Sequence, residues 1–345
     1  MKISIARRVA VLLLLLAPLN ACRDALVGPA APNTPERNFE ALWHEFDRLY
    51  GTFETKKVDW NALYAQYRPR VNAATTDREL LTVMGQLLDH LDDNHIYVRP
   101  MRSTGLPYYE GGILGRRKFE DFDAKVADAY VTGKQTYGAD LAYGWLTPKV
   151  AYLKIKGFAD NYNQYPPAMD KVLGELAAAA GMVVDLRDNG GGEDRVAQYI
   201  ANRFASGRSL SFTSRLRNGP GHDDFGPVLA FYTRPEGPFQ YTKPVVVLTR
   251  RATFSAGETF VLAMKRNPNV VTVGDSTGGA FSDAVKRELP NGWIYRVPIA
   301  DVRAADGKNY ESIGLAPDVL VQNTKEELRA GRDKALEKAS ELLSR

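Results

Sequence analysis

The sequence contains few of the residues on which several structural classes depend. Its 345 residues include one Cys and four His, which excludes an internal disulfide and argues against a structural zinc site. The 45 Lys and Arg residues scarcely outnumber the 41 Asp and Glu residues, and no basic run is interleaved with aromatic residues, so nucleic acid is not an expected partner. The composition is that of a globular protein. We therefore expect a folded protein that uses no metal or cofactor.

The one strongly apolar run lies at the N-terminus and has the features of an export signal. Basic residues at positions 2, 7 and 8 precede an apolar stretch over 9–16 that is too short to span a membrane. The sequence then continues Leu19-Asn20-Ala21-Cys22, which resembles a bacterial lipobox. We expect residues 1–21 to be a lipoprotein signal peptide and the lipid to be attached at Cys22. The alternative is a stray Cys after an ordinary signal peptide.

This interpretation predicts where the protein lies and how its charge is distributed. A lipid-anchored chain would face the periplasm in the bacterial cell envelope, on the inner or the outer membrane. Removal of residues 1–21 takes away three basic residues and leaves the charges nearly balanced. Residues 22–37 are rich in Pro, Ala and Gly, a composition typical of a tether.

The rest of the chain divides by the period of its apolar residues. Residues 38–95 have helical spacing, and Thr76 and Glu79 form a capping-box pattern at the start of a long helix. Residues 96–149 give no clear pattern beyond an apolar stretch at 141–146. From 150 to 345, short apolar strands alternate with helices, which predicts an α/β core. The strands are expected at 150–155, 182–186, 245–249 and 270–273, and the helices at 167–180, 193–204, 255–265 and from Thr324 almost to the C-terminus.

Two turns of this core have a composition that is compatible with catalysis. In the first, a buried strand is followed by Asp185–Gly192, which ends in three glycines and can present backbone N–H groups to a phosphate or an oxyanion. The ending of a P-loop and the spacing of a dinucleotide-binding motif are both absent. Taken alone, a purely structural glycine turn fits this segment best.

The second turn places Ser255 where a strand gives way to a helix. A Ser at this position is commonly only a helix cap. The functional alternative is a nucleophile whose neighbouring amide, at Ala256, donates to an oxyanion at the positive end of the helix. The small residues Ala256 and Gly257 would leave room for a substrate carbonyl.

Together these segments resemble the carboxyl-terminal processing peptidase superfamily of serine proteases, which includes the tail-specific proteases, the tricorn core protease and interphotoreceptor retinoid-binding protein. The matching segments occur in the family's order, at 91–95, 150–158, 185–192, 255–258, 274–279 and 311–318. The resemblance implies a crotonase-like α/β spiral core preceded by a small all-helical domain. Residues 96–149 are short for the PDZ domain of tail-specific proteases and contain no convincing carboxylate-binding loop.

The resemblance also implies catalytic roles for individual residues. Tail-specific proteases use a Lys as the general base, but its position is Ala280 here. The tricorn-like branch instead uses a His, which His95 matches, and imidazole accepts protons near neutral pH. The implied site comprises the nucleophile Ser255, the base His95 and the carboxylate Glu311, with backbone oxyanion donors at Gly191 and Ala256 and a turn supported by Asp185, Arg187, Gly190 and Gly192.

Several alternatives remain open at this point. The residue before His95 is Asn94 instead of the Ser of the tricorn-like relay, so the connection from Glu311 to His95 is undetermined. His222 is the reserve candidate for the base or for a substrate contact. We expect a serine endopeptidase that acts on a peptide or protein substrate. An inactive hydrophobic-ligand-binding relative and an esterase that uses the same site are the alternatives, and the oligomeric state is unknown.

Overall fold

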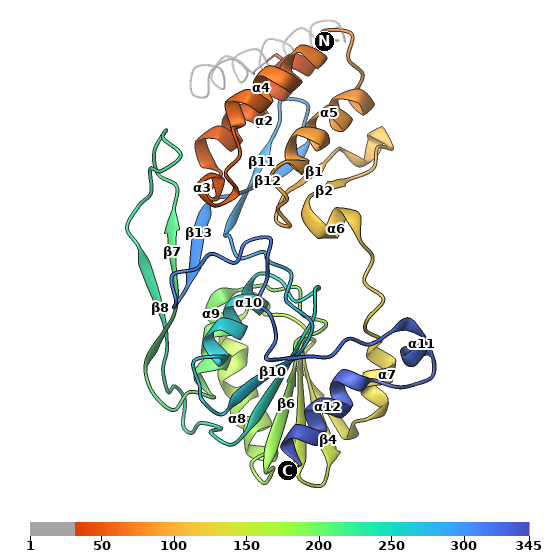
Figure 1. Ribbon diagram of the computed structural model, residues 1–345, viewed down its shortest axis with the longest axis vertical. Helices are drawn as coiled ribbons and strands as arrows, with labels where there is room; N and C mark the ends of the chain where they lie inside the picture. Colours follow the sequence, from red (N-terminus) through yellow and green to blue (C-terminus); the bar gives the residue numbers. More distant parts are fainter. Residues whose placement is uncertain (1–31, 345) are drawn as a thin grey trace, which may run out of the picture.

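The computed structural model describes residues 32–344 and has two lobes stacked along its longest axis (Figure 1). The expected signal peptide, Cys22 and most of the expected tether lie outside the described residues. We call residues 35–116 with 284–298 the helical lobe. The α/β lobe comprises residues 124–274 with 319–343. No helix in the described range is both long and apolar enough to cross a bilayer.

The helical lobe begins with four helices packed around an aromatic core. They are α2 (Pro35–Leu49), α3 (Phe53–Lys56), α4 (Trp60–Tyr67), which a 3-10 turn at 68–70 follows, and α5 (Asp77–Asp89). Thr34, Asp59 and Thr76 cap three of them, and the expected capping box of Thr76 with Glu79 is present. The stacked rings of Trp43 and Trp60 each donate an indole N–H to the other residue's carbonyl oxygen. Buried indole groups are thereby satisfied.

Strands from two distant parts of the chain complete this lobe. They are β1 (Tyr97–Arg99), β2 (Tyr109–Glu110), β11 (Ala284–Glu288) and β12 (Ile294–Pro298), in the antiparallel order β11-β12-β1-β2. A short 3-10 turn (102–104) and helix α6 (Gly112–Arg116) flank β2. Trp293, Tyr295 and Val297 are buried in the same core as the four helices. The helical lobe therefore depends on residues almost 200 positions further along the chain.

The α/β lobe is built on a seven-stranded sheet of order β14-β10-β9-β6-β5-β4-β3. The strands are β3 (Thr132–Tyr137), β4 (Leu141–Thr147), β5 (Val150–Ile155), β6 (Gly181–Asp185), β9 (Val245–Thr249), β10 (Val270–Gly274) and β14 (Val319–Leu320). Strands β5, β6, β9, β10 and β14 pair in parallel, whereas β3 and β4 are antiparallel. Every residue of β6 and β9 is buried, as expected where helices cover both faces.

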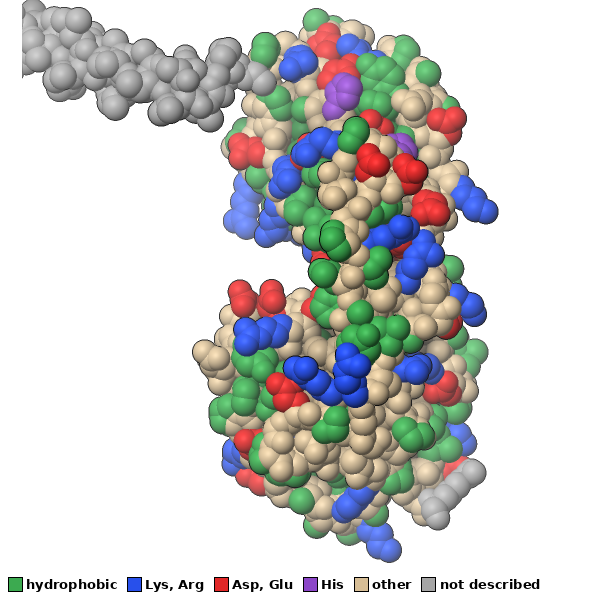
Figure 2. All heavy atoms as spheres, turned by 90° about the vertical axis from the view of Figure 1, so that its left-hand side faces the viewer, with side chains coloured by type: hydrophobic (Ala, Val, Ile, Leu, Met, Phe, Trp, Pro, Cys, Tyr) green, Lys and Arg blue, Asp and Glu red, His purple; other side chains and the backbone are tan. Residues whose placement is uncertain are grey.

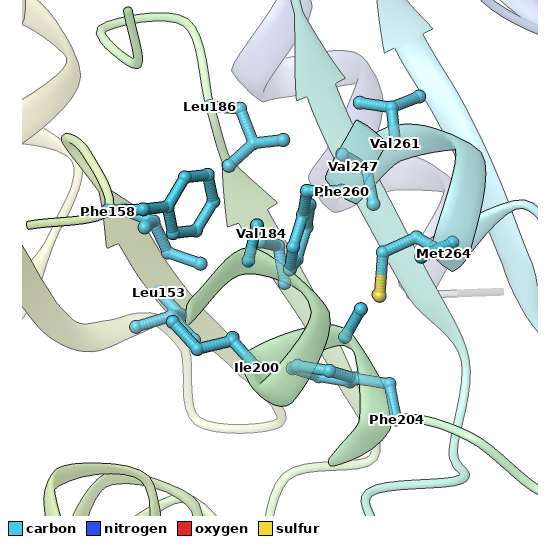
Figure 3. Close-up of a cluster of buried hydrophobic side chains, with 14 of the residues drawn as sticks. Leu153, Phe158, Val184, Leu186, Ile200, Phe204, Val247, Phe260, Val261 and Met264 are labelled. Atoms are coloured by element: carbon cyan, nitrogen blue, oxygen red, sulfur yellow. The ribbon is translucent and has the colours of Figure 1, made fainter. Parts of the chain in front are cut away.

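Different helices cover the two faces of the sheet, and they contact alternate residues of its strands. Helices α8 (Tyr165–Glu175), α9 (Asp194–Asn202) and α10 (Ala256–Met264) share one core with Leu153, Val184 and Val247 (Figure 3). Helix α12 (Lys334–Leu343) packs on the other face against Val183 and Val246. The short α7 (Ala124–Ala129) and α11 (Lys325–Arg329) lie near α12 (Figure 1). This packing fixes the turns that follow β6 and β9 at one edge of the sheet.

A third sheet, of order β13-β7-β8, extends along one side of both lobes (Figure 1). Its strands are β7 (Ser209–Leu216), β8 (Leu229–Thr233) and β13 (Ala300–Ala304). At the end of β7, Arg217 is buried and donates to the carbonyl oxygens of Asp47, Arg48 and Tyr50. Away from this connection, Figure 2 shows a deep notch between the two lobes.

The structure confirms several of the expected elements and corrects others. Strands β5 and β9 have the expected bounds, and α9 and α10 agree within two residues. The expected continuous final helix is wrong: α11 ends at Arg329, and Gly331 has φ +76° before Asp333 caps α12. The expected helix at 167–180 ends at Glu175. Residues 96–149, which had no clear pattern, supply strands to both lobes.

Candidate active site

Ser255 occupies a strained turn between β9 and α10. Its φ of 55° and ψ of −126° are rare for a residue other than Gly and cost about 1–3 kcal/mol. Its amide donates to the carbonyl oxygen of Ala280 at 3.0 Å and to Glu258 Oε2 at 3.2 Å. The next amide, Ala256, is the first of the helix and has no acceptor within it. A sharp turn thus presents a Ser side chain beside a free helical amide.

The carboxylate of Glu258 holds this turn against the segment 277–282. It is fully buried and accepts hydrogen bonds from the amides of Gly279 and Ala280, both at 2.7 Å, and from the Thr277 hydroxyl at 2.5 Å. Burial raises the pKa of Glu258 to about 7, and these donors oppose the rise. The sequence analysis assigned no role to Glu258, although Ser255 and Glu258 have the spacing of a capping box.

The glycine turn lies directly against Ser255. Gly191 has φ +100°, and a Cβ there would lie 2.7 Å from Ser255 Cβ. The Gly191 amide, expected to be an oxyanion donor, instead donates to Asn189 Oδ1 at 2.8 Å. The Phe254 amide donates to the Asn189 carbonyl oxygen at 3.2 Å. Asn189, another residue that sequence reasoning missed, therefore connects the two turns and occupies the Gly191 amide in this state.

The supporting residues of the glycine turn form a buried ion-pair network. Arg187 donates to both carboxylate oxygens of Asp185, at 3.0 and 2.7 Å, and to Asp333 at 2.8 Å. The Tyr152 hydroxyl also donates to Asp185. These contacts occupy Asp185 and Arg187 away from any substrate, while Gly190 has open space around it and Gly192 lies against Phe158.

His95 lies in the turn that leads from α5 into β1. Its backbone amide donates to Asp93 Oδ1 at 2.8 Å, and its side chain is 95% buried. Its Nδ1 atom is buried without a hydrogen-bond partner among the described residues. Burial, aided by the positive charge of Arg296, lowers the pKa of His95 to about 3. The imidazole is therefore neutral at physiological pH, as a general base must be before it accepts a proton.

Glu311 approaches the site from the loop that follows β13. Its Oε2 accepts hydrogen bonds from the amides of Phe281 and Ser282, at 2.8 and 3.1 Å, whereas Oε1 is buried and unpartnered within residues 32–344. Burial and the nearby Asp93 carboxylate raise the pKa of Glu311 well above its ordinary value. The next residue, Ser312, donates to the Asp92 carbonyl oxygen in the His95 turn.

Lys56 of α3 joins the Glu311 loop to the His95 turn. Its ammonium group donates to the Asp92 carbonyl oxygen at 2.9 Å and to the Ser312 hydroxyl. Its charge lowers the pKa of both Asp93 and Glu311, in opposition to the effect of burial. No sequence motif indicated this role, because Lys56 and Ser312 are 256 positions apart.

Segment 277–282 brings the candidate residues of both lobes together. Asn94 donates to the Gly278 carbonyl oxygen at 3.1 Å and accepts from the Ile113 amide at 2.7 Å. Asn94 therefore fastens the His95 turn to this segment and to α6 without bridging His95 and Glu311. Ser255 and Glu311 contact the same segment through Ala280 and Phe281. No hydrogen bond joins Ser255 to His95, or His95 to Glu311, in the described part of the chain.

The reserve candidate base, His222, has partners elsewhere. His222 Nε2 lies 2.9 Å from Asp47 Oδ1, and its ring stacks on Phe53. Among residues 32–344, no group of three or more His, Cys, Asp or Glu side chains could hold a metal ion. His95 is thus the candidate base that shares a contact segment with Ser255.

Comparison with known proteins identifies the family. The model of peptidase family S41 matches residues 149–321, half of the chain, and the tricorn protease C1 domain model matches residues 31–89. The chain belongs to peptidase family S41. This confirms the resemblance to the carboxyl-terminal processing peptidases and the expected α/β fold with a helical N-terminal region.

Relatives of this S41 protein include solved structures and curated enzymes. A candidate peptidase from Parabacteroides merdae is 30% identical, with a TM-score of 0.81, 90% of this chain and 97% of that chain covered. The tricorn protease structure shares the fold at 15% identity and a TM-score of 0.60, over 90% of this chain and 37% of that one. The carboxy-terminal processing protease CtpA of Bacillus subtilis is 28% identical over 174 residues, which cover 50% of this chain and 35% of CtpA. The match thus spans little more than a third of the length of CtpA.

Proposed function

We propose that this S41 protein is a serine peptidase in which Ser255 attacks a substrate peptide carbonyl. The observation that carries the proposal is the strained Ser255 turn at the start of α10, in contact with the glycine turn. The Ala256 amide and the helix N-terminus would stabilise the oxyanion. The Gly191 amide would join them once it leaves Asn189 Oδ1. Family membership supports this reaction, and the Ser–His mechanism is our inference.

His95 is the proposed general base and Glu311 its orienting partner. Each has one buried, unpartnered atom, His95 Nδ1 and Glu311 Oε1, and an unpaired buried polar atom costs about 1–3 kcal/mol. A movement that pairs these two atoms would remove both penalties. With the Glu311 carboxyl ionised, the pair would also raise the basicity of His95, which burial and Arg296 now lower. Substrate binding between the lobes is the proposed cause of that movement.

The test is labelling and turnover of the full chain. We expect wild type to react with a serine-reactive fluorophosphonate and to hydrolyse peptides in a fluorogenic mixture, and Ser255→Ala to do neither. His95→Gln is expected to lose at least about a hundredfold in kcat/KM, the typical contribution of a general base. His222→Gln is the matched control, because His222 pairs with Asp47. If wild type labels no better than Ser255→Ala, the proposal fails.

A second candidate is an inactive relative that binds a hydrophobic ligand. The absence of a hydrogen bond between Ser255 and His95 among the described residues favours it. The strained Ser255 conformation argues against the binding protein, because a protein that only binds a ligand has no reason to keep that strain. Co-purification of a lipid, together with failure to label, would favour the binding protein.

We also propose that the protein is exported and lipid-anchored through Cys22, a position outside the described residues. The support is the lipobox-like sequence that ends in the only Cys. Growth of the producing bacterium with a labelled fatty acid is expected to label wild type and to leave Cys22→Ser unlabelled. Equal labelling of the two proteins would contradict the anchor.

A further inference from the structure

The sheet that follows the His95 turn bears, on one face, basic side chains that form no ion pair with any described residue. Ile96 and Val98 point into the core of the helical lobe. Because side chains alternate along a strand, Tyr97 and Arg99 point to the opposite face. His95 lies in the turn that ends two residues before Tyr97. The outer face therefore begins next to the turn that holds the candidate base.

Strand register places two more basic residues on the face. Arg296 of β12 is the partner of Tyr97 in β1, and Lys286 of β11 is the partner of Arg296. The three residues Tyr97, Arg296 and Lys286 thus form one row across the sheet. The neighbouring row contains Arg99, Ile294 and Glu288.

The three basic residues of this face are Arg99, Lys286 and Arg296. None of them forms an ion pair or a side-chain hydrogen bond within residues 32–344. Other basic residues nearby do form such contacts, including Arg287, which binds Glu45 on the opposite side of β11. The Arg99 guanidinium lies 4.1 Å from the Tyr97 ring centre and 5.6 Å from that of Tyr108. Arg296 has Asp93 and Asp283 within electrostatic range. The rings hold Arg99 in place and leave its N–H groups available.

The basic face borders a surface groove of about 720 Å³. Its lining includes Tyr97, Arg99, Tyr108 and Lys286, and Glu288 is its one carboxylate. Figure 2 shows Lys and Arg side chains gathered at the edge of the helical lobe just above the notch. An excess of cations in such a groove attracts anionic groups.

We propose that the face formed by Tyr97, Arg99, Lys286 and Arg296 is a subsite that binds a carboxylate of the peptide substrate. The inference rests on the proposed peptidase function, since a peptide is the ligand that brings carboxylates past His95. Guanidinium groups bind carboxylates through two parallel hydrogen bonds. The carboxylate comes from an Asp or Glu side chain or from a free C-terminus.

The geometry also sets where the carboxylate lies in the substrate. A strand advances about 3.3 Å per residue, so Tyr97 lies at most about 7 Å and Arg99 at most about 13 Å from His95 along the chain. An extended peptide advances by the same distance per residue. The bound carboxylate is therefore expected within about four residues of the scissile bond.

Binding to the full chain carrying Ser255→Ala tests the subsite without turnover. The probes are rhodamine-labelled decapeptides of Ala and Gly. One has three central Glu residues and an amidated C-terminus, the second has Gln in their place, and the third is the Gln peptide with a free C-terminus. By fluorescence anisotropy at low salt, at least one carboxylate-bearing peptide is expected to bind about tenfold tighter than the amidated Gln peptide, with the preference reduced by added salt.

Variants show whether the preference arises at this face. Adding Arg99→Gln and Lys286→Gln to the Ser255→Ala chain is expected to reduce the preference for a carboxylate-bearing peptide below about threefold. Adding Arg78→Gln and Lys125→Gln removes the same charge at exposed positions elsewhere and should leave it unchanged. Tighter binding of the Glu peptide identifies a side-chain carboxylate, and tighter binding of the free-C-terminus peptide identifies a terminal one.

Equal binding of all three peptides would overturn the proposal, as would a preference unaffected by Arg99→Gln with Lys286→Gln. The result is separable from the peptidase proposal because it needs no reaction at Ser255. If the preference depends on Arg99 and Lys286 while fluorophosphonate labelling fails, the subsite stands and the peptidase function does not.

Discussion

At the residue scale, buried ionisable groups dominate the candidate site. Asp93, Glu258 and Glu311 are all carboxyl groups whose pKa is raised, with burial as the largest cause. Glu258 is satisfied by four donors, including the Ser255 amide. Glu311 has one satisfied oxygen and one unpartnered oxygen. The difference fits a structural role for Glu258 and a role that requires movement for Glu311.

The buried His95 makes a prediction about stability in acid. Its pKa is about 3 in the folded protein and about 6.5 in the unfolded chain. Between these values the unfolded state binds the proton more readily, so the folded state loses stability as the pH falls. From pH 7 to pH 5 the loss from this group is about 2 kcal/mol.

Urea denaturation of wild type and His95→Gln at both pH values measures this loss. The buried carboxyl groups are present in both proteins, so the difference between them isolates His95. We expect wild type to lose about 2 kcal/mol more than the variant on going from pH 7 to pH 5. An identical pH dependence in the two proteins would show that His95 is not desolvated in solution.

At the element scale, the two turns that follow β6 and β9 must fit closely. A Cβ at Gly191 would lie 2.7 Å from Ser255 Cβ, and φ there is +100°, whereas a Cβ at Gly190 would meet nothing within 4 Å. We expect Gly191→Ala to displace the turns and lower kcat/KM by at least about a hundredfold, the cost of losing an oxyanion donor. Gly190→Ala is the neighbouring control and should lose far less. Similar losses in both variants would refute this contact.

The elements also show what the sequence could and could not predict. Uniformly apolar strands such as β9, and the capping box of Thr76 with Glu79, were predicted because their signals are local. The break at Gly331 was missed, since the apolar pattern continues through it. The contact of Asn189 Oδ1 with the Gly191 amide depends on the conformation of one turn. The contact of Lys56 with Ser312 depends on chain topology, which one sequence does not reveal.

At the scale of the whole molecule, the chain passes between the lobes more than once. It leaves the helical lobe after α6 and returns as β11 and β12. The core of that lobe therefore includes Leu289, Trp293, Tyr295 and Val297 from the second passage. As a result, His95 is positioned both by the helices that precede it and by a hairpin that follows Ser255 in the sequence.

This arrangement predicts that the N-terminal part of the lobe does not fold alone. Burial of four large apolar side chains contributes about 1.5–3 kcal/mol each, which is comparable to the whole stability of a small domain, about 5–15 kcal/mol. A fragment of residues 33–116 is thus expected to show no cooperative thermal transition by circular dichroism. Fusing residues 284–298 to it through a flexible linker should restore one, and the same fusion with Trp293→Ala and Tyr295→Ala should not. If the short fragment melts cooperatively without the hairpin, its helices form a domain of their own. The position of His95 would then not depend on β12.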